Sequence, residues 1–275
     1  MVRGSWILVG VVLAAVLAGC GSSQETATLT PEQRYAKAKA LFDDRDYLEA
    51  INEFTVITLQ YQGSAYAADA QYFIAESRFE RAEYLLAAFE YSVVKRNYPA
   101  SARVADAAYK SALSYYMLSP KSSLDQQYTK KAIDEFQSFA EYYPTHSLAA
   151  EAAQKIKELT NRLAKKQYET ARLYATMEYY KAATLSYDVI IEKYHDTEYA
   201  PLAVIEKAEL LFSRKRYTEA RTEVHSFLSK FPNSVLRARA EALNLKIDER
   251  LQSSPANQQP ADKPNAAAPN KQAGT

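Results

Sequence analysis

A pattern of alanines and large apolar residues recurs five times along this chain of 275 residues. Each copy holds two short segments. In each segment, the residue three positions before an alanine is mostly aromatic, and the residue four positions after it is mostly large and apolar. The alanines are Ala38 and Ala50, Ala75 and Ala87, Ala112 and Ala132, Ala171 and Ala183, and Ala208 and Ala220. Offsets of three and four place such residues on one face of an α-helix, and alanines let neighbouring helices approach closely. The sequence therefore predicts an all-α fold of five helical hairpins.

The spacing within the copies is regular, apart from one insertion. The two alanines of a copy lie 12 residues apart in four copies and 20 apart in the third. The extra residues surround Ser119–Gln126, which we interpret as a loop. Each second segment is followed by an aromatic residue, and in three copies a proline comes next and favours a helix end. These aromatic residues are Tyr61, Tyr98, Tyr143, Tyr194 and Phe231, and the prolines are Pro99, Pro144 and Pro232.

The limits of the repeated region follow from helix signals. Thr30-Pro31-Glu32-Gln33 offers an N-cap, a proline at the first helical position and an acceptor at the third. Residues 149–175 contain no glycine or proline, which indicates one unusually long helix. We expect the five repeats to occupy residues 31–251. Residues 252–275 lack apolar periodicity and are expected to be disordered.

The first residues are typical of a secretory signal. Arg3 is followed by the apolar run Trp6–Val16, which is too short for an ordinary membrane span of about 20 residues. Leu17-Ala18-Gly19-Cys20 resembles the bacterial lipobox. That resemblance implies removal of residues 1–19 and acylation of Cys20, the chain's single cysteine, with residues 20–30 as a flexible tether. The alternative is an ordinary signal peptide with an incidental cysteine. The residue after the cysteine is Gly21. An aspartate at this position would resemble an inner-membrane retention signal, so the glycine favours attachment to the outer membrane, facing the periplasm.

Charge and motifs give no support for catalysis. The formal net charge of +1 provides no strong field for nucleic acid. The three histidines lie at or near predicted helix ends without short metal-ligand spacing, and no phosphate loop or nucleophile motif is present. The basic run 214–216 is balanced by Glu209 and Glu219, so we interpret it as a solvated turn. We therefore predict a recognition protein without catalytic residues, cofactor or metal.

The repeat resembles the tetratricopeptide repeat, although its spacing exceeds the usual 34 residues in that family. Together with the lipobox and tether, it resembles the BamD family of the β-barrel assembly machinery. The most specific part is NRLAKKQYETARLY, at 161–174, which is similar to that family's junction between repeats three and four. YQGSAYAADAQY, at 61–72, is similar to the entry to its second repeat, although Gln62 stands where a proline is usual.

The resemblance to this family implies a function and partners. It implies that the C-terminal repeats bind an Omp85-type barrel-inserting subunit, and that the N-terminal repeats bind unfolded outer-membrane proteins. Other lipoproteins of the assembly machinery are implied partners, and the acyl chains imply membrane attachment. Three alternatives stay open: a pilotin, which usually has closer to 34-residue spacing and no long central helix; a cell-wall or division protein of the same repeat class; and a lipid-anchored enzyme.

Four aromatic residues of the first two repeats are candidates for a peptide groove. Tyr35, Phe42, Tyr72 and Phe79 occupy first-helix positions that commonly face the concave groove of tetratricopeptide proteins. An aromatic floor with polar neighbours suits an extended peptide that ends in an aromatic residue, which resembles the C-terminal signal of barrel proteins. The alternative is that these rings pack between adjacent repeats.

Overall fold

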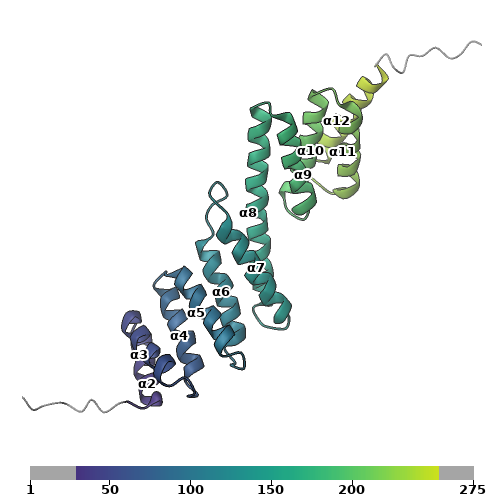
Figure 1. The fold of residues 1–275 in the computed structure, drawn as a ribbon. Coiled ribbons are helices and arrows are strands. Elements are labelled where there is room, and N and C mark those ends of the chain that lie inside the picture. The colour runs from purple at the N-terminus through teal and green to yellow at the C-terminus, as the bar shows by residue number, and fades with distance from the viewer. Residues whose placement is uncertain (1–28, 254–275) are drawn as a thin grey trace, which may run out of the picture. The chain divides into compact units, whose positions relative to one another are not determined.

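The computed structural model describes residues 29–253, and the part it describes consists of α-helices joined by short turns (Figure 1). The chain divides after Glu83 into two compact units. The first contains α2 (Pro31–Asp43), α3 (Tyr47–Gln60) and α4 (Ala67–Glu80). The second contains α5 (Tyr84–Asn97), α6 (Val104–Leu118), α7 (Gln127–Tyr142), α8 (Ala149–Thr176), α9 (Tyr180–Lys193), α10 (Tyr199–Ser213), α11 (Tyr217–Lys230) and α12 (Arg237–Gln252). The predicted all-α architecture of tetratricopeptide-like hairpins is confirmed.

The first repeat begins at the predicted cap. The Gln33 amide donates to the Thr30 hydroxyl at 3.2 Å, and the Thr30 amide donates to the Gln33 side chain at 3.1 Å. This reciprocal pair satisfies two amides that the first helical turn leaves without partners. Pro31 at the first helical position loses no hydrogen bond, so α2 starts where the sequence indicates.

One tight turn recurs where four first helices end. After α2, the Arg45 amide donates to the Phe42 carbonyl at 3.0 Å and the Asp46 amide donates to the Leu41 carbonyl at 2.8 Å. These are the two hydrogen bonds of a Schellman motif, which needs a left-handed residue after the helix. That residue is Arg45 (φ 66°), Ala82 (58°), Glu178 (62°) or Lys215 (60°). The shared turn explains the constant spacing of 12 residues between the two alanines, and the third repeat, with its insertion, lacks it.

The aromatic residue after each second helix is its C-cap. The Tyr61 amide donates to the Ile57 carbonyl at 2.9 Å, and the Ser64 amide donates back to the Tyr61 carbonyl at 2.9 Å. The equivalent bonds recur at Tyr98, Tyr143, Tyr194 and Phe231. All five rings are half-buried, so each repeat ends with an aromatic ring set against the helices it follows.

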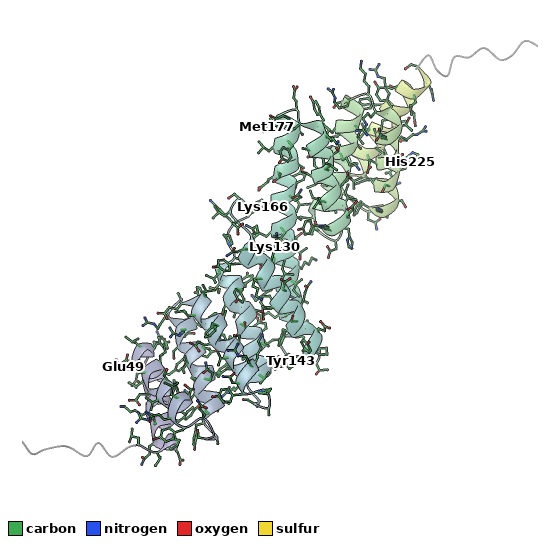
Figure 2. The ribbon with its side chains drawn as sticks, viewed as in Figure 1. Glu49, Lys130, Tyr143, Lys166, Met177 and His225 are labelled. Carbon is green, nitrogen blue, oxygen red and sulfur yellow. The ribbon has the colours of Figure 1, made fainter. Side chains whose placement is uncertain are left out.

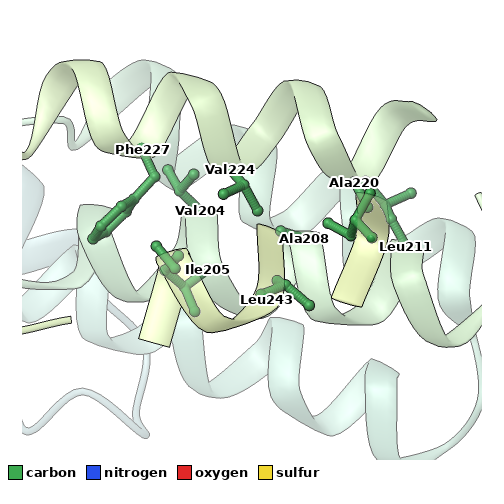
Figure 3. Packing of buried hydrophobic residues seen from close by; sticks show 10 residues of the cluster. Val204, Ile205, Ala208, Leu211, Ala220, Val224, Phe227 and Leu243 are labelled. Atoms are coloured by element: carbon green, nitrogen blue, oxygen red, sulfur yellow. The ribbon is translucent and has the colours of Figure 1, made fainter. Parts of the chain in front are cut away.

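Ten buried alanines mark the helix contacts. Each alanine of the repeat pattern has no exposed surface. In the first unit, Ala38 and Ala50 share a core with Phe54 and Ile57, and α4 contributes Ala70 and Ile74. In the second unit, the alanines of α10 and α11 lie among Val204, Ile205 and Phe227 (Figure 3).

Helix α8 serves two cores. The prediction of one long helix is confirmed, since α8 runs unbroken through 28 residues. Its N-terminal half places Ala152 and Leu159 in a core with α6 and α7. Its C-terminal half places Tyr168 and Ala171 in a separate core with α9 and α10. Although long, α8 is too polar to cross a membrane, and no described helix qualifies as a span.

Helix α12 was not assigned as an element from the sequence. It packs Ala240, Leu243 and Ile247 against α10 and α11, in the manner of a sixth first helix. Most of its other residues are exposed and polar, which suits a terminal helix that closes a repeat stack.

Ion pairs join the two helices of a repeat at equivalent positions. In the first repeat, Lys37 Nζ lies 2.5 Å from Glu53 Oε1 and Arg34 Nη1 lies 2.5 Å from Glu53 Oε2. In the fifth, Lys207 Nζ lies 2.6 Å from Glu223 Oε1, and it also lies 2.5 Å from Asp188 Oδ1 on α9 of the fourth repeat. Burial disfavours the charged form of Glu53, but the hydrogen bonds and charges of Lys37 and Arg34 outweigh burial and lower its pKa.

The left-handed turn residues predict a stabilising substitution. Lys215→Gly removes the cost of a Cβ at positive φ, which is about 1–2 kcal/mol. Glycine also raises the conformational entropy of the unfolded chain, and this offsets about half of that gain in stability. The expected net gain is about 0.5–1 kcal/mol in the free energy of unfolding. Lys246→Gly, at an exposed helical position in α12, is the matched control and should lose about 1 kcal/mol. Urea denaturation measures both, and equal losses in the two variants would contradict the turn assignment.

The lowered pKa of Glu53 predicts a pH-dependent contribution to stability. The ionised carboxylate stabilises the fold at pH values above the ordinary glutamate pKa of 4.5, and this contribution is lost as the pH falls through the lower folded pKa. Glu53→Gln should therefore melt below the wild type at neutral pH, and the difference should shrink below about pH 4.5. Circular dichroism melts between neutral pH and pH 3 measure this. Glu80→Gln, an exposed glutamate on α4, is the control, and a pH-independent difference for Glu53→Gln would refute the mechanism.

Candidate functional site

The structure separates the four candidate groove residues into two classes. Tyr35 and Tyr72 stand three residues before the alanine of a first helix, and this position is buried in the second to fifth repeats. Its occupants in the later repeats, Tyr109, Tyr168 and Ile205, are 3%, 9% and 0% exposed, and Tyr72 is 7% exposed. Tyr35 is half-buried, with its ring centroid 5.7 Å from that of Phe54 and 5.2 Å from that of Tyr66. These two tyrosines have the surroundings of packing residues.

Phe42 and Phe79 stand four residues after the alanine of a first helix, and every first-helix occupant of this position is half-buried. The Phe42 ring meets the rings of Tyr47 and Phe73 edge-on, with centroids 5.4 Å and 5.1 Å away. Lys39 Nζ lies 5.5 Å from the Phe42 centroid and 5.2 Å from the Phe73 centroid, and it also pairs with Asp43. We call Phe42 and Phe79 the aromatic rim. They keep part of their surface available to a ligand, whereas Tyr72 does not.

Sequence reasoning missed Phe73, which links the rings of the first unit. Its ring stacks on Phe54 at 5.6 Å and meets Tyr72 at 5.8 Å, in addition to Phe42. The residue lies between two positions of the repeat frame, so the pattern of offsets could not single it out. Its large apolar side chain beside Tyr72 was the only available signal.

A second candidate surface lies on the C-terminal unit, between α9 and the end of α10. A hollow of about 590 Å³ is lined there by residues that include Tyr180, Leu185, Leu210 and Arg214. The Arg214 guanidinium lies over the Tyr180 ring at 4.2 Å, and Leu185 is 58% exposed. We call these four residues the C-terminal hollow. An apolar floor beside cationic side chains suits an apolar partner with acidic residues.

The basic run 214–216 forms the turn between α10 and α11, as interpreted from the sequence. Arg214 is the C-cap of α10, Lys215 has positive φ and Arg216 is the N-cap of α11. Arg216 pairs with Glu219. Glu209, expected to balance this run, instead pairs with Arg239 of α12 at 2.5 Å.

A carboxylate joins three helices of the C-terminal unit. Glu206 of α10 accepts hydrogen bonds from the hydroxyls of Tyr168 at 2.5 Å and Tyr187 at 2.9 Å. Burial raises the pKa of both phenols, and the negative charge of Glu206 raises it further. The tyrosines therefore stay protonated and act as donors, which fastens α8 and α9 to α10.

The histidines form no site. His146 packs its ring on Phe139 at 5.4 Å and lies 3.5 Å from Asp106. His195 is exposed in the turn before α10. His225 lies in the middle of α11, so its expected place near a helix end was wrong (Figure 2). No cluster of three potential metal ligands occurs within residues 29–253. Cys20, with the signal segment and tether up to residue 28, lies outside the described residues, as does the tail from residue 254.

A family model of outer membrane lipoproteins, named YfiO, matches residues 27–211. The chain belongs to this family. The matched segment runs from the end of the tether to the middle of the fifth repeat, and so includes both the aromatic rim and the long helix α8.

The chain is also similar to individual proteins. The chain is 27% identical to the outer membrane protein assembly factor BamD of Rickettsia prowazekii (strain Madrid E) over 225 residues, which cover 81% of this chain and 90% of that protein. Among solved structures, it is similar to the TPR2AB domain of yeast Sti1 in complex with pHSP90, at 18% identity and a TM-score of 0.43, covering 81% of this chain and 84% of that one. A thermophilic TPR protein of Thermus thermophilus, TTC0263, is 16% identical with a TM-score of 0.33, covering 78% and 100%.

Proposed function

We propose that this YfiO-family lipoprotein is a lipid-anchored scaffold on the periplasmic face of the outer membrane that helps insert β-barrel proteins. The observation that carries the proposal is the match to the assembly factor BamD of R. prowazekii, which spans 90% of that protein. Stacked helical hairpins offer extended binding surfaces, which suits a scaffold rather than an enzyme. The 28-residue α8 also favours this function over that of a pilotin.

The anchor in this proposal is Cys20. Stable attachment to a bilayer takes more than one acyl chain, which a lipidated N-terminal cysteine supplies. The tether up to Thr30 then leads to the capped start of α2. The protein would thus be held close to the outer membrane while its repeats extend into the periplasm.

Replacement of the cysteine tests the anchor. Cys20→Ser removes the thiol that would carry the lipid, so we expect the variant to leave the outer-membrane fraction and to lose labelled palmitate. Ser22→Ala, two residues along the tether, is the control and should fractionate like the wild type. A variant that stays in the outer membrane, with equal label in both proteins, would refute the lipid anchor.

The aromatic rim is the proposed contact for unfolded barrel proteins. Phe42 and Phe79 are half-buried, and Lys39 beside Phe42 provides a positive charge for a C-terminal carboxylate. An aromatic side chain at the end of an extended peptide would pack against these rings. Aromatic residues of this kind commonly dominate binding energy.

The C-terminal hollow is the proposed contact for the Omp85-type barrel-inserting subunit. Leu185 is 58% exposed, and it lies beside a tyrosine and an arginine, two residue types enriched at interface centres. Other assembly lipoproteins would occupy further surfaces of the repeats. Since the rim and the hollow lie on different units, each contact can be removed separately.

This arrangement predicts two separable binding defects. Phe79→Ala should weaken binding of a barrel-protein C-terminal peptide by about tenfold or more, because truncating such an anchor costs about 2 kcal/mol. It should leave co-purification of the inserting subunit from detergent-solubilised membranes unchanged. Leu185→Arg should reduce co-purification of the inserting subunit and leave the affinity for the peptide unchanged. Fluorescence anisotropy measures the peptide affinity, and immunoblotting measures the subunit.

Thermal stability serves as the control for both variants. Tyr72→Ala is the comparison, because truncating a ring that is 7% exposed should lower the melting temperature as well as any affinity. If folded Phe79→Ala binds the peptide as the wild type does, the rim is not the substrate site. If no barrel-inserting subunit co-purifies with the wild type, the proposed function itself fails.

A further inference from the structure

The inserted loop of the third repeat, residues 119–126, is fastened to the middle of α8. Arg162 Nη1 donates to the Ser119 carbonyl at 3.0 Å and to the Ser119 hydroxyl at 2.7 Å. One helical turn further, Lys166 Nζ donates to the Leu124 carbonyl at 2.6 Å. Two long cationic side chains of α8 therefore hold both ends of the loop.

Side chains of the loop itself complete this attachment. The buried Gln126 amide donates to the carbonyls of Lys121 at 2.9 Å and Leu124 at 3.0 Å. The Ser122 hydroxyl, also buried, donates to Glu169 of α8 at 3.2 Å. The loop is thus ordered by its own polar groups, which lowers the entropy that a partner would have to remove on binding.

The ordered loop nevertheless presents an apolar side chain to solvent. Leu124 is 52% exposed, and Met117, at the end of α6 where the loop begins, is 46% exposed. Since Leu124 has its carbonyl bound and its side chain outward, the same bonds that fix the loop also fix the direction of this leucine.

Positive charge surrounds the leucine without full compensation. Lys121 and Lys130 are exposed and form no ion pair with any residue of the described chain, and Lys166 bonds a carbonyl rather than a carboxylate (Lys130 and Lys166 are labelled in Figure 2). The nearby carboxylates keep their charge, but each accepts a hydrogen bond from a group of the protein. Asp125 accepts from the Gln127 amide, Glu158 from Arg162 and Tyr116, and Glu169 from Ser122, with Lys165 3.9 Å away.

The position of Lys130 adds to this field. It lies in the first turn of α7, which holds no acidic residue, and a cation there opposes the positive end of the helix dipole. The Asp125 carboxylate, which accepts from the Gln127 amide, offsets part of that cost at the same helix end. An anionic partner at the exposed Lys130 side chain would offset the rest.

A hollow beside the loop provides room for a chain segment. It has a volume of about 500 Å³ between the loop and the turn before α10. Its lining includes the cations Lys121, Arg162 and Lys165 and the carboxylates Glu158 and Glu198. Two exposed apolar side chains and a concave surface suit a protein segment better than a bilayer, which requires a broad apolar face for attachment.

We propose that Lys121, Leu124, Lys130 and the adjoining hollow form a docking surface for an acidic protein segment that carries a large apolar side chain among its carboxylates. The carboxylates pair with the uncompensated lysines, and the apolar side chain packs on Leu124. The surface is distinct from the aromatic rim and the C-terminal hollow, so it stands independently of the proposed function.

The test uses a short fluorescein-labelled peptide of glutamates around a central leucine pair, with the lysine-for-glutamate peptide as its counterpart. The full chain should bind the acidic peptide about tenfold or more tightly than the basic one, and the affinity should fall as salt is raised. Lys121→Glu with Lys130→Glu should abolish this preference. Leu124→Ser should weaken binding several-fold without changing its salt dependence.

Matched controls separate a defined surface from general charge. Lys230→Glu with Lys246→Glu reverses two exposed lysines on α11 and α12 and should bind like the wild type. Arg162→Ala keeps Lys121 and Lys130 but frees the loop, so it should weaken binding and speed hydrogen exchange in residues 119–126. Melting temperatures confirm that each variant is folded.

Three results would overturn the proposal. The first is equal loss of binding in the control and loop variants, which would indicate general charge attraction. The second is unchanged binding in the folded loop variants. The third is binding of phosphatidylglycerol-containing vesicles that needs Lys121 and Leu124 while the acidic peptide does not bind, which would assign the surface to a membrane.

Discussion

Close contact between helices at buried alanines is the interaction on which the rest of this structure depends. All ten alanines of the repeat frame have no exposed surface. With only a methyl group at these positions, the paired helices approach closely enough for the larger side chains on either side to interdigitate. The Schellman turn then sets the register, since a fixed number of residues between the alanines brings them opposite each other. Four repeats accept a side chain at positive φ to keep that turn.

The long helix α8 changes what the third and fourth repeats can do. One half of it completes the core of α6 and α7 and the other half belongs to the core of α9 and α10, so its middle lies between the two cores. The inserted loop of the third repeat lies over this middle section and is bound by Arg162 and Lys166. The insertion and the long helix are thus parts of one local arrangement, although they are separate departures from the repeat spacing in the sequence.

Helix periodicity made most of the fold predictable from the sequence. Offsets of three and four, with a cap at Thr30 and no helix breaker in residues 149–175, depend only on local backbone geometry, and the structure follows them. The candidate site was less predictable. Tyr35 and Phe42 lie on the same face of α2, and only the neighbouring helix decides which ring is covered. The bonds from Arg162 to Ser119 join residues 43 positions apart, a separation that no repeat frame contains. Helix α12 was missed because no second segment of the repeat pattern follows it in the sequence to form a recognisable pair.

The abundance of tyrosine follows from the thinness of a helical-hairpin stack. The chain has 22 tyrosines and 10 phenylalanines. In a stack of paired helices, few positions lie far from solvent, so a large side chain there has a buried ring and a tip that reaches polar surroundings. Tyr187 is 2% exposed, yet its hydroxyl reaches Glu206, and Tyr116 is half-buried while its hydroxyl donates to Glu158. A phenylalanine in place of Tyr187 or Tyr116 would remove one hydrogen-bond donor from Glu206 or Glu158. Where no polar tip is needed, as at Phe54, Phe136 and Phe227 in the hairpin cores, phenylalanine is used and is completely buried.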